Sequence, residues 1–355
     1  MSKRTPLYDA HVEAGGKIVE FGGWDMPLNY GSQIKEHEAV RTRAGVFDVS
    51  HMTIIDVTGS GAKTYLQRLV ANNVGKLKAP GQALYGALLN EQGGVIDDLI
   101  VYAREDGYRC VVNASTRDKV LAWMAAQADA EVQILERDEL AMLAIQGPEA
   151  CAIYAAISGH NLADVDAFNA LEFGDTMVGR TGYTGEEGVE VMLPGAAAVS
   201  LWRDLMAADV PPIGLAARDT LRLEAGLNLY GQDMTDETHP YESNIGWTVS
   251  MKPVERDFIG RAALEAVREA GVARKLTGLV LEQKGVMRHG YPVITEAGVG
   301  EVTSGIFSPT LGYSIALARV PAEAQGAVEV EIRGKRVAAR LVKPPFVRNG
   351  KALVG

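Results

Sequence analysis

The chain contains few residues of the kinds that hold metals or form disulfides. It has two cysteines and six histidines in 355 residues, and the histidines are scattered. Neither Cys110 nor Cys151 lies in a C-x-x-C motif, and both are set among apolar residues. We therefore expect no metal site, and two buried thiols are more typical of a reducing compartment than of a disulfide-stabilised fold.

The sequence also lacks long apolar runs and an excess of positive charge. No apolar segment approaches membrane-spanning length, and the N-terminal segment MSKRTPLYDAHVEAGG has no apolar core of a signal peptide. We therefore expect a cytoplasmic protein that does not insert into membranes. The formal net charge of −10 gives no overall surface for neutralising phosphates, which argues against nucleic-acid binding.

The common nucleotide-binding and hydrolase motifs are missing as well. Residues 59–64 superficially resemble a phosphate-binding P-loop, but Ala62 stands where that motif needs glycine. The sequence has no G-x-S-x-G motif and no G-x-G-x-x-G motif after a predicted strand. Hydrolase and dinucleotide-binding functions therefore lack their main evidence.

The composition is that of an ordinary globular protein, with 47% hydrophobic and 23% charged residues, and the length suffices for two or three domains. The spacing of apolar residues predicts a strand over 17–21 and a helix over 33–43 that Ser32 caps. A further strand over 45–52 carries His51. We expect His51 to be a hydrogen-bonded structural residue, with a catalytic role as the alternative.

The rest of the chain changes character twice. Residues 53–145 predict a compact α+β unit with a mostly antiparallel sheet, which could be inserted into another domain. A helix in this unit is expected to begin at Ser115, which with Asp118 matches the spacing of a capping box. Residues 214–227 predict a helix, and we expect most of its four charges, Arg218, Asp219, Arg222 and Glu224, to face solvent. From about 270 onward, short alternating runs predict a small β-barrel or sandwich.

The segment 88–102, LLNEQGGVIDDLIVY, contains two adjacent acids in a predicted strand. A turn signal over 90–94 precedes the strand, and period two places Asp97 and Asp98 on opposite faces. Whichever face is buried carries a carboxylate, which is costly unless the carboxylate is paired, hydrogen-bonded or reserved for a ligand. A functional acid and a strand end with one solvated acid are both compatible with this pattern.

A second acid, Glu190, lies between aliphatic residues at the end of the glycine-rich run 179–193, GRTGYTGEEGVEVML. Strand-embedded acids, glycine-rich loops and interspersed tyrosines suit a flat, polar heteroaromatic ligand. A pteridine is one such ligand, because its amino-pyrimidine edge can make two hydrogen bonds to a carboxylate and its faces favour aromatic contacts.

A series of motifs in a fixed order carries a resemblance over essentially the whole chain. They are RTPLYDAH, FGGWDMPLNYG, GVFDVSHM, GGVIDDLIVY, VVNAS, QGP, RTGYTGEEGVEVM, GLAARDTLRLEAGLNLYGQDM, GWTV, DFIGR and GEVTSGIFSPTLG. The sequence resembles the T-protein family of the glycine cleavage system, which are tetrahydrofolate-dependent aminomethyltransferases.

The resemblance implies an α+β fold with three domains in a ring around a central folate channel. The first domain is expected to be discontinuous, over 1–52 and 146–269, with 53–145 inserted as the second domain. Residues 270–355 are expected to form a β-barrel-like C-terminal domain.

The resemblance also implies a reaction. The aminomethyl group on the dihydrolipoyl arm of H-protein reacts with tetrahydrofolate, giving 5,10-methylenetetrahydrofolate, ammonia and reduced H-protein. Tetrahydrofolate is then a co-substrate, lipoylated H-protein is the partner, and no metal or flavin is needed. The alternative is a folate-binding module, or a folate-dependent demethylase of the same family, without H-protein chemistry.

Six residues match functional positions of the family. Asp98 matches the key catalytic aspartate, where a carboxylate in a dry site would stabilise a cationic methylene species. Glu190 matches the acid that holds the pteridine edge. The other residues expected to line the folate pocket are Tyr85, Asn113, Tyr183 and Arg218. Residues 164–172 lack the aromatic pair found on the pocket side in some relatives.

Overall fold

The computed structural model describes residues 2–354, which divide into two compact units. Unit 1 consists of Met1–Tyr65, Gly75–Leu84 and Leu99–Leu221. Unit 2 consists of Leu66–Val74, Tyr85–Asp98 and Arg222–Gly355. The chain therefore passes between the two units several times, and each unit is described separately below.

The core of unit 1 is a five-stranded antiparallel sheet with the strand order β11-β12-β13-β10-β4. The central strands β10 and β13 pair along their full lengths, with Ala144 opposite Glu190. Every residue of β10 is buried, as expected for a strand covered on both faces. The bounds are β4 (Gly45–Asp48), β10 (Leu140–Gln146), β11 (Ala170–Phe173), β12 (Thr176–Gly179) and β13 (Gly188–Pro194).

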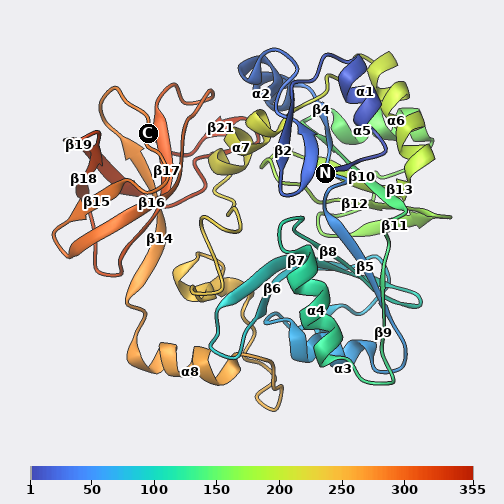
Figure 1. Cartoon of the computed structure of the whole chain (residues 1–355), viewed down its shortest axis with the longest axis horizontal. Helices are drawn as coiled ribbons and strands as arrows, with labels where there is room; N and C mark the ends of the chain where they lie inside the picture. The colour runs from blue at the N-terminus through green and yellow to red at the C-terminus, as the bar shows by residue number, and fades with distance from the viewer. Residues whose placement is uncertain (1, 355) are drawn as a thin grey trace. The chain divides into compact units, whose positions relative to one another are not determined.

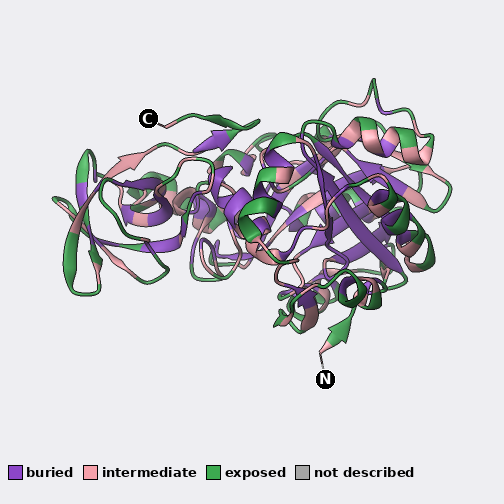
Figure 2. Ribbon diagram, turned by 90° about the horizontal axis from the view of Figure 1, so that it is seen from above, coloured by how far each residue is buried: buried purple, intermediate pink, exposed green. Residues whose placement is uncertain are grey.

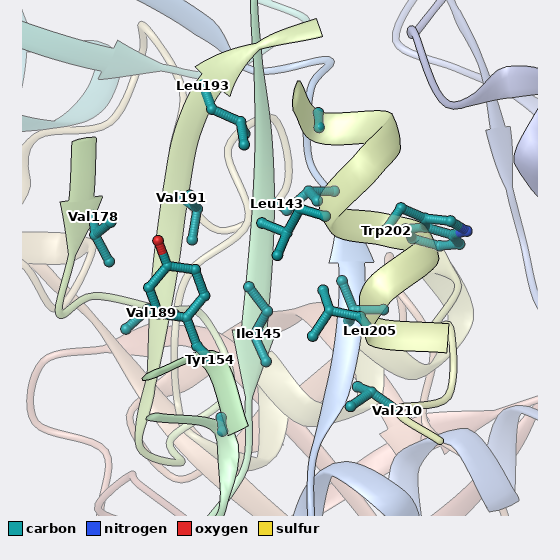
Figure 3. Packing of buried hydrophobic residues seen from close by; sticks show 14 of the residues in the cluster. Leu143, Ile145, Tyr154, Val178, Val189, Val191, Leu193, Trp202, Leu205 and Val210 are labelled. Atoms are coloured by element: carbon teal, nitrogen blue, oxygen red, sulfur yellow. The ribbon is translucent and has the colours of Figure 1, made fainter. Parts of the chain in front are cut away.

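Two helices cover one face of this sheet (Figure 3). Leu143 and Ile145 of β10 belong to one core cluster with Tyr154 of α5 (Ala150–Ser158) and Trp202 of α6 (Gly195–Ala207). The alternate residues of β10, such as Met142, belong to a second cluster on the other face. The strand period of two thus divides β10 between two hydrophobic cores.

The other elements of unit 1 are short. Helix α2 begins after Ser32, whose hydroxyl accepts a hydrogen bond from the Lys35 backbone N–H at 3.4 Å, which confirms the predicted N-cap. The strands β1, β3 and β2 form a small sheet in that order. The bounds are α1 (Tyr8–Glu13), α2 (Gln33–Thr42), β1 (Lys3–Arg4), β2 (Ile18–Phe21) and β3 (Trp24–Pro27). Helix α7 (Leu215–Glu224) begins in unit 1 and ends in unit 2.

A second five-stranded sheet has the order β6-β7-β8-β5-β9 and carries the two adjacent acids on β7. Strands β6 and β7 each continue from one unit into the other. The bounds are β5 (Thr53–Thr58), β6 (Ala83–Leu89), β7 (Val95–Arg104), β8 (Gly107–Val112) and β9 (Gln133–Glu136), with α3 (Ala62–Leu69) and α4 (Arg117–Gln127).

The predicted capping box of α4 is wrong. The helix begins at Arg117, Thr116 is its N-cap residue, and no side chain caps the helix. The Thr116 hydroxyl instead donates to the Asn113 carbonyl at 3.0 Å. Because Ser115 precedes the N-cap position, the Ser115–Asp118 spacing has no capping role.

Unit 2 contains a closed barrel with the strand order β14-β17-β16-β15-β18-β19, drawn in orange and red in Figure 1. The sequence left barrel and sandwich open, and the pairing of β14 with both β17 and β19 closes the barrel. The bounds are β14 (Arg274–Leu281), β15 (Pro292–Thr295), β16 (Gly298–Phe307), β17 (Ser314–Pro321), β18 (Ala327–Ile332) and β19 (Lys335–Val342).

The barrel strands alternate between interior and solvent. Val328 and Val330 of β18 are buried, whereas Glu329 between them is exposed. Figure 2 shows the same contrast between buried and exposed residues along the ribbon. The remaining elements of unit 2 are three single-turn helices, α8 and a two-stranded sheet. Their bounds are Val74–Lys76, Pro240–Glu242, Gly246–Thr248, α8 (Arg261–Ala270), β20 (Val347–Arg348) and β21 (Lys351–Ala352).

The predicted helix over 214–227 is confirmed as α7, but the prediction that its charges face solvent is wrong for two of them. Arg222 is 2% exposed and Glu224 is fully buried. Arg222 donates to Asp233 at 2.9 Å, and Glu224 accepts a hydrogen bond from the Thr310 hydroxyl at 2.8 Å. Each charge is thus compensated by a group more distant in the sequence, which helical periodicity could not reveal.

The domain boundaries at 52, 145 and 269 stay predictions. None of the helices within residues 2–354 has the length and apolar character required to cross a membrane.

Candidate functional site

The six candidate residues fall into two groups, each inside one unit. Tyr85 and Asp98 belong to unit 2. Asn113, Tyr183, Glu190 and Arg218 belong to unit 1.

A tight turn fixes the start of strand β7, just before the two acids. Gly93 has a φ of +81°, and a Cβ on Gly94 would lie 1.7 Å from the Asp236 carbonyl oxygen, so both positions require glycine. The Asn90 side chain closes the turn, because its amide oxygen accepts from the Gly94 N–H at 2.8 Å and its amide nitrogen donates to the Asp236 carbonyl at 3.0 Å.

The two acids of β7 differ in exposure. Asp97 is fully buried, and Asp98 is half-buried. The Tyr85 hydroxyl donates to Asp98 Oδ2 at 2.9 Å. The Tyr85 backbone is itself held, because its carbonyl accepts from the Asn72 side chain at 2.8 Å. The structure therefore brings Tyr85 and Asp98 together as one hydrogen-bonded pair.

Negative charge accumulates around Asp98. Burial raises the pKa of the Tyr230 hydroxyl, and the charges of Asp236, Asp97 and Asp98 raise it further. The indole of Trp247, which is 73% exposed, lies with its ring centroid 6.0 Å from that of Tyr85. An anionic region beside aromatic faces is suited to a cationic or electron-poor group.

Glu190 is the centre of the second group. It lies on the central strand β13 and is 7% exposed. Its Oε2 accepts a hydrogen bond from the Thr181 hydroxyl at 2.6 Å, and no other residue of 2–354 donates to this carboxylate. Burial raises the pKa of Glu190, whereas the Thr181 hydrogen bond and the Arg218 charge oppose that rise. Oε1 remains available to a donor from a ligand.

The loop before Glu190 is organised by the side chain of Gln146, which is 1% exposed at the end of β10. Its amide nitrogen donates to the Thr181 carbonyl at 3.1 Å, and its amide oxygen accepts from the Thr184 hydroxyl at 2.9 Å. A Cβ on Gly182 or Gly188 would lie within 2.5 Å of this amide. Gly182 and Gly188 therefore make room for the Gln146 side chain, whose hydrogen bonds hold the loop.

Arg218 and Tyr183 are in direct contact. The Arg218 guanidinium carbon lies 4.6 Å from the centre of the Tyr183 ring, within the range of a cation–π interaction. Arg218 is in the first turn of α7 and is half-buried, as is Tyr183. The Arg218 charge also acts on Glu190, where it favours the ionised carboxylate.

His51 differs from its predicted role as a hydrogen-bonded structural residue on a strand. Strand β4 ends at Asp48, and His51 lies in the following turn. It is 3% exposed, and its Nδ1 has no hydrogen-bond partner within residues 2–354. Burial and, to a lesser extent, the Arg218 charge lower the pKa of His51 to about 4, while the Asp48 charge opposes this shift. His51 is therefore a buried neutral imidazole, covered edge-on by Phe21 at 5.7 Å between ring centroids.

Asn113 directly follows β8 and is half-buried. Its neighbour Val112 pairs with Leu99, the residue after Asp98 on β7. The structure thus places Asn113 at the end of the strand next to β7 and leaves its predicted role untested.

Sequence reasoning did not single out Thr181, Tyr102 or Gln146. Thr181 and Gln146 lay inside recognised motifs, but their side chains act across 9 and 38 residues of sequence. A polar residue at the buried end of an apolar strand, as at Gln146, was the available signal. Within residues 2–354, no group of three or more His, Cys, Asp or Glu could hold a metal ion.

Family models and known proteins match this sequence over nearly its whole length. Residues 7–253 match the family model described as the GCVT N-terminal domain, and residues 274–348 match the glycine cleavage T-protein C-terminal barrel domain. The chain is 58% identical to an aminomethyltransferase of Alcanivorax borkumensis, over 99% of both chains. It is 56% identical to an aminomethyltransferase of Pseudomonas syringae pv. tomato, over 100% of both.

One solved structure is similar over nearly the same length. The glycine cleavage system aminomethyltransferase T from Bartonella henselae superposes with a TM-score of 0.93 at 36% identity. The match covers 98% of this chain and 99% of that one.

Proposed function

Because the chain belongs to the glycine cleavage T-protein family, we propose that it transfers a methylene carbon from the aminomethyl-dihydrolipoyl arm of H-protein to tetrahydrofolate, with release of ammonia. The chain is an aminomethyltransferase, an enzyme of one-carbon transfer. Lipoylated H-protein as partner and tetrahydrofolate as co-substrate belong to the proposal, as does the ring of three domains around a folate channel.

The observation that carries the proposal is the state of Glu190. It is a buried carboxylate to which Thr181 alone donates among residues 2–354, although a carboxylate can accept about four hydrogen bonds. The amino-pyrimidine edge of a pteridine offers two parallel donors that a carboxylate can accept together. Tyr183 adds an aromatic face and Arg218 a planar cation beside it. These residues fit the flat, polar ring of folate.

Asp98 has the complementary role in this proposal. Breaking the bond between the transferred carbon and nitrogen develops positive charge on that carbon. A fixed carboxylate with little access to water stabilises such charge more strongly than water does. Tyr85 orients the carboxylate through its hydrogen bond, and Asp97 and Asp236 add to the negative potential. The chemistry then needs neither a metal nor a flavin.

The alternative is a folate-binding module without transfer chemistry, in which Glu190 suffices and Asp98 is structural. An assay with lipoylated H-protein carrying the aminomethyl group and tetrahydrofolate separates the two. We expect methylenetetrahydrofolate and ammonia to form in equal amounts. Tight folate binding without any product would favour the module.

Substituting Glu190 tests the pocket directly. Glu190→Gln removes a charged acceptor, so we expect tetrahydrofolate to bind more weakly by about 1.5–3 kcal/mol. Turnover at saturating folate should change much less, because the carboxylate holds the pteridine edge equally in the ground and transition states. Isothermal titration measures the affinity, and steady-state kinetics measures turnover.

A matched control lies in the same loop. Glu187 is exposed and pairs with Arg180. Glu187→Gln should leave folate affinity unchanged. Equal affinities for Glu190→Gln and the unsubstituted enzyme would show that Glu190 does not bind the pteridine.

A further inference from the structure

A chain of three buried side chains leads from strand β7 to Glu190. The hydroxyls of Tyr102 and Thr181 are 2.8 Å apart, and Thr181 Oγ1 is 2.6 Å from Glu190 Oε2. Tyr102 is fully buried and Thr181 is 7% exposed. Thr181 directly precedes Gly182 in the loop before β13, whereas Tyr102 lies on β7 of the second five-stranded sheet. The two hydroxyls therefore connect two sheets to the carboxylate.

The available protons fix which group donates in each of these two hydrogen bonds. An ionised carboxylate only accepts hydrogen bonds, so the Thr181 hydroxyl must use its single proton on Glu190. Tyr102 must then donate to the Thr181 oxygen. Burial and the nearby charge of Glu190 raise the pKa of Tyr102, so the phenol keeps the proton that it donates. Tyr102 thus keeps the Thr181 hydroxyl turned toward Glu190.

The backbone leaves space for this arrangement at Gly179, the residue opposite Glu190 in the sheet. A Cβ on Gly179 would lie 2.8 Å from the Tyr102 hydroxyl and 3.1 Å from Thr181 Oγ1. Gly179 does not have a positive φ, so the space beside it, and not its conformation, accounts for glycine there. The glycine at the end of β12 therefore accommodates the two hydroxyls.

Arg218 of α7 is the one charged group that acts on Glu190 besides this chain, within the described residues. The Arg218 side chain lies over the Tyr183 ring and is only half-buried, so solvent partly screens its charge. Tyr102 is the titratable group on the side of β7. Against the cost of burying the carboxylate, the Thr181 hydrogen bond is thus the main local support for its charged form.

We infer that Thr181, supported by Tyr102, is a positioning residue that keeps Glu190 ionised and turned so that its free oxygen meets the amino-pyrimidine edge of folate. This inference rests on the proposed binding of folate by Glu190. Thr181 occupies one lone pair of Oε2, which leaves Oε1 and the second lone pair of Oε2 for the two donors of the pteridine.

The test compares Thr181→Val with Thr181→Ser. Valine keeps the shape of threonine but loses the hydroxyl, whereas serine keeps the hydroxyl. Tetrahydrofolate is titrated into each full-length variant under anaerobic conditions between about pH 5 and pH 9. For Thr181→Val we expect the acid limb of the affinity profile to move up by about one pH unit, which corresponds to roughly 10-fold weaker binding on that limb. Affinity should recover toward the alkaline end.

Three further variants make the result specific. Thr181→Ser should keep the original profile, and Tyr102→Phe should shift it in the same direction by a smaller amount. Thr277→Val is the control, because it removes a threonine hydroxyl that bonds only the Val342 carbonyl in the barrel. We expect no shift for Thr277→Val. If Thr181→Val does not fold, as judged by circular dichroism, Tyr102→Phe carries the test with the same criterion.

The outcomes separate this inference from the proposed function. An unchanged pH profile in Thr181→Val, with binding weakened in Glu190→Gln, would overturn the positioning role and leave folate binding by Glu190 intact. Unchanged affinity in Glu190→Gln would overturn the binding of folate by Glu190, on which this inference rests. A uniform loss of affinity at every pH in Thr181→Val would indicate a general packing defect and also contradict the inference.

Discussion

The two neighbouring acids on β7 show how one residue step separates two physical environments. Asp97 is fully buried, whereas Asp98 is half-buried and accepts a hydrogen bond from Tyr85. Strand geometry puts their side chains on opposite faces. Only Asp98 therefore combines a fixed orientation with access for a ligand, as expected for the acid that stabilises developing charge.

Asp98→Asn should separate chemistry from folding. Asparagine keeps the shape and an acceptor oxygen for Tyr85, but the negative charge is lost. Loss of one preorganised electrostatic group typically lowers turnover by about 100- to 1000-fold. We expect that loss with a nearly unchanged melting temperature and folate affinity, measured by kinetics, calorimetry and titration.

Asp97→Asn is the control for that experiment. Because Asp97 is fully buried on the opposite face, its substitution should lower stability more than turnover at temperatures where the variant is folded. Near-normal turnover in Asp98→Asn, or a selective loss of activity in Asp97→Asn, would contradict the assignment.

His51 should make the stability of the protein depend on pH. Its pKa is lowered from 6.5 to about 4 by burial, so between these values the unfolded chain binds the proton and the folded chain does not. The stabilising contribution is complete above pH 6.5 and is lost as the pH falls toward 4. The free energy of unfolding should fall by roughly 1–3 kcal/mol from this group over that interval.

Urea unfolding at several pH values checks this prediction. His51→Gln removes the titrating group, so the difference between the two proteins should shrink or reverse as the pH falls below 6.5. A difference that stays constant with pH would show that His51 does not titrate as the structure implies.

At the scale of elements, the turn before β7 is the critical connection. A Cβ on Gly94 would collide with the Asp236 carbonyl at 1.7 Å, and both groups are backbone-anchored. Gly94→Ala should therefore displace the turn and lower stability by about 1–3 kcal/mol or more. Since Asp98 lies four residues further along the same strand, turnover should fall as well.

Gly334→Ala is the comparison, because its φ is +75° and no atom lies within 4 Å of the added Cβ. It should cost only the strain of a left-handed alanine, roughly 1 kcal/mol, and leave turnover unchanged. Thermal unfolding and kinetics on both variants measure the difference. Equal activity in the two would mean that the turn does not position Asp98.

At the scale of the molecule, each unit is held by charged groups buried where distant segments meet. In unit 2, Asp233 is fully buried and accepts from Arg222 at 2.9 Å, the Leu229 N–H at 2.8 Å and the Ser304 hydroxyl at 2.8 Å. The segment after α7 and barrel strand β16 thus share one carboxylate.

Asp233→Asn should be strongly destabilising. It removes the charge that balances a buried guanidinium, which typically costs about 3–5 kcal/mol. Glu329→Gln, which loses an exposed pair with Arg336, should cost about 0–1 kcal/mol. Denaturant unfolding measures both. A small effect of Asp233→Asn would show that Arg222 is stabilised mainly by its other contacts.

The sequence by itself determined the features that depend on near neighbours. Apolar alternation predicted the barrel strands after 270, helical spacing predicted α7, and the glycine turn placed the two acids on β7. The ordered motifs identified the family, because a motif consists of consecutive residues and can be recognised without the fold. Steric preferences and side-chain periodicity act over a few residues, so they can be read without the fold.

The partners of the buried polar and charged groups could be identified from the tertiary structure alone. The Tyr102–Thr181 bond spans 79 residues and the Arg222–Ser304 bond spans 82, so no local pattern could predict either. The same applies to the buried charges Arg222 and Glu224 of α7, and to His51, whose Nδ1 has no hydrogen-bond partner within residues 2–354. Burial and hydrogen bonding depend on which distant segments are in contact, and these contacts form only when the chain folds.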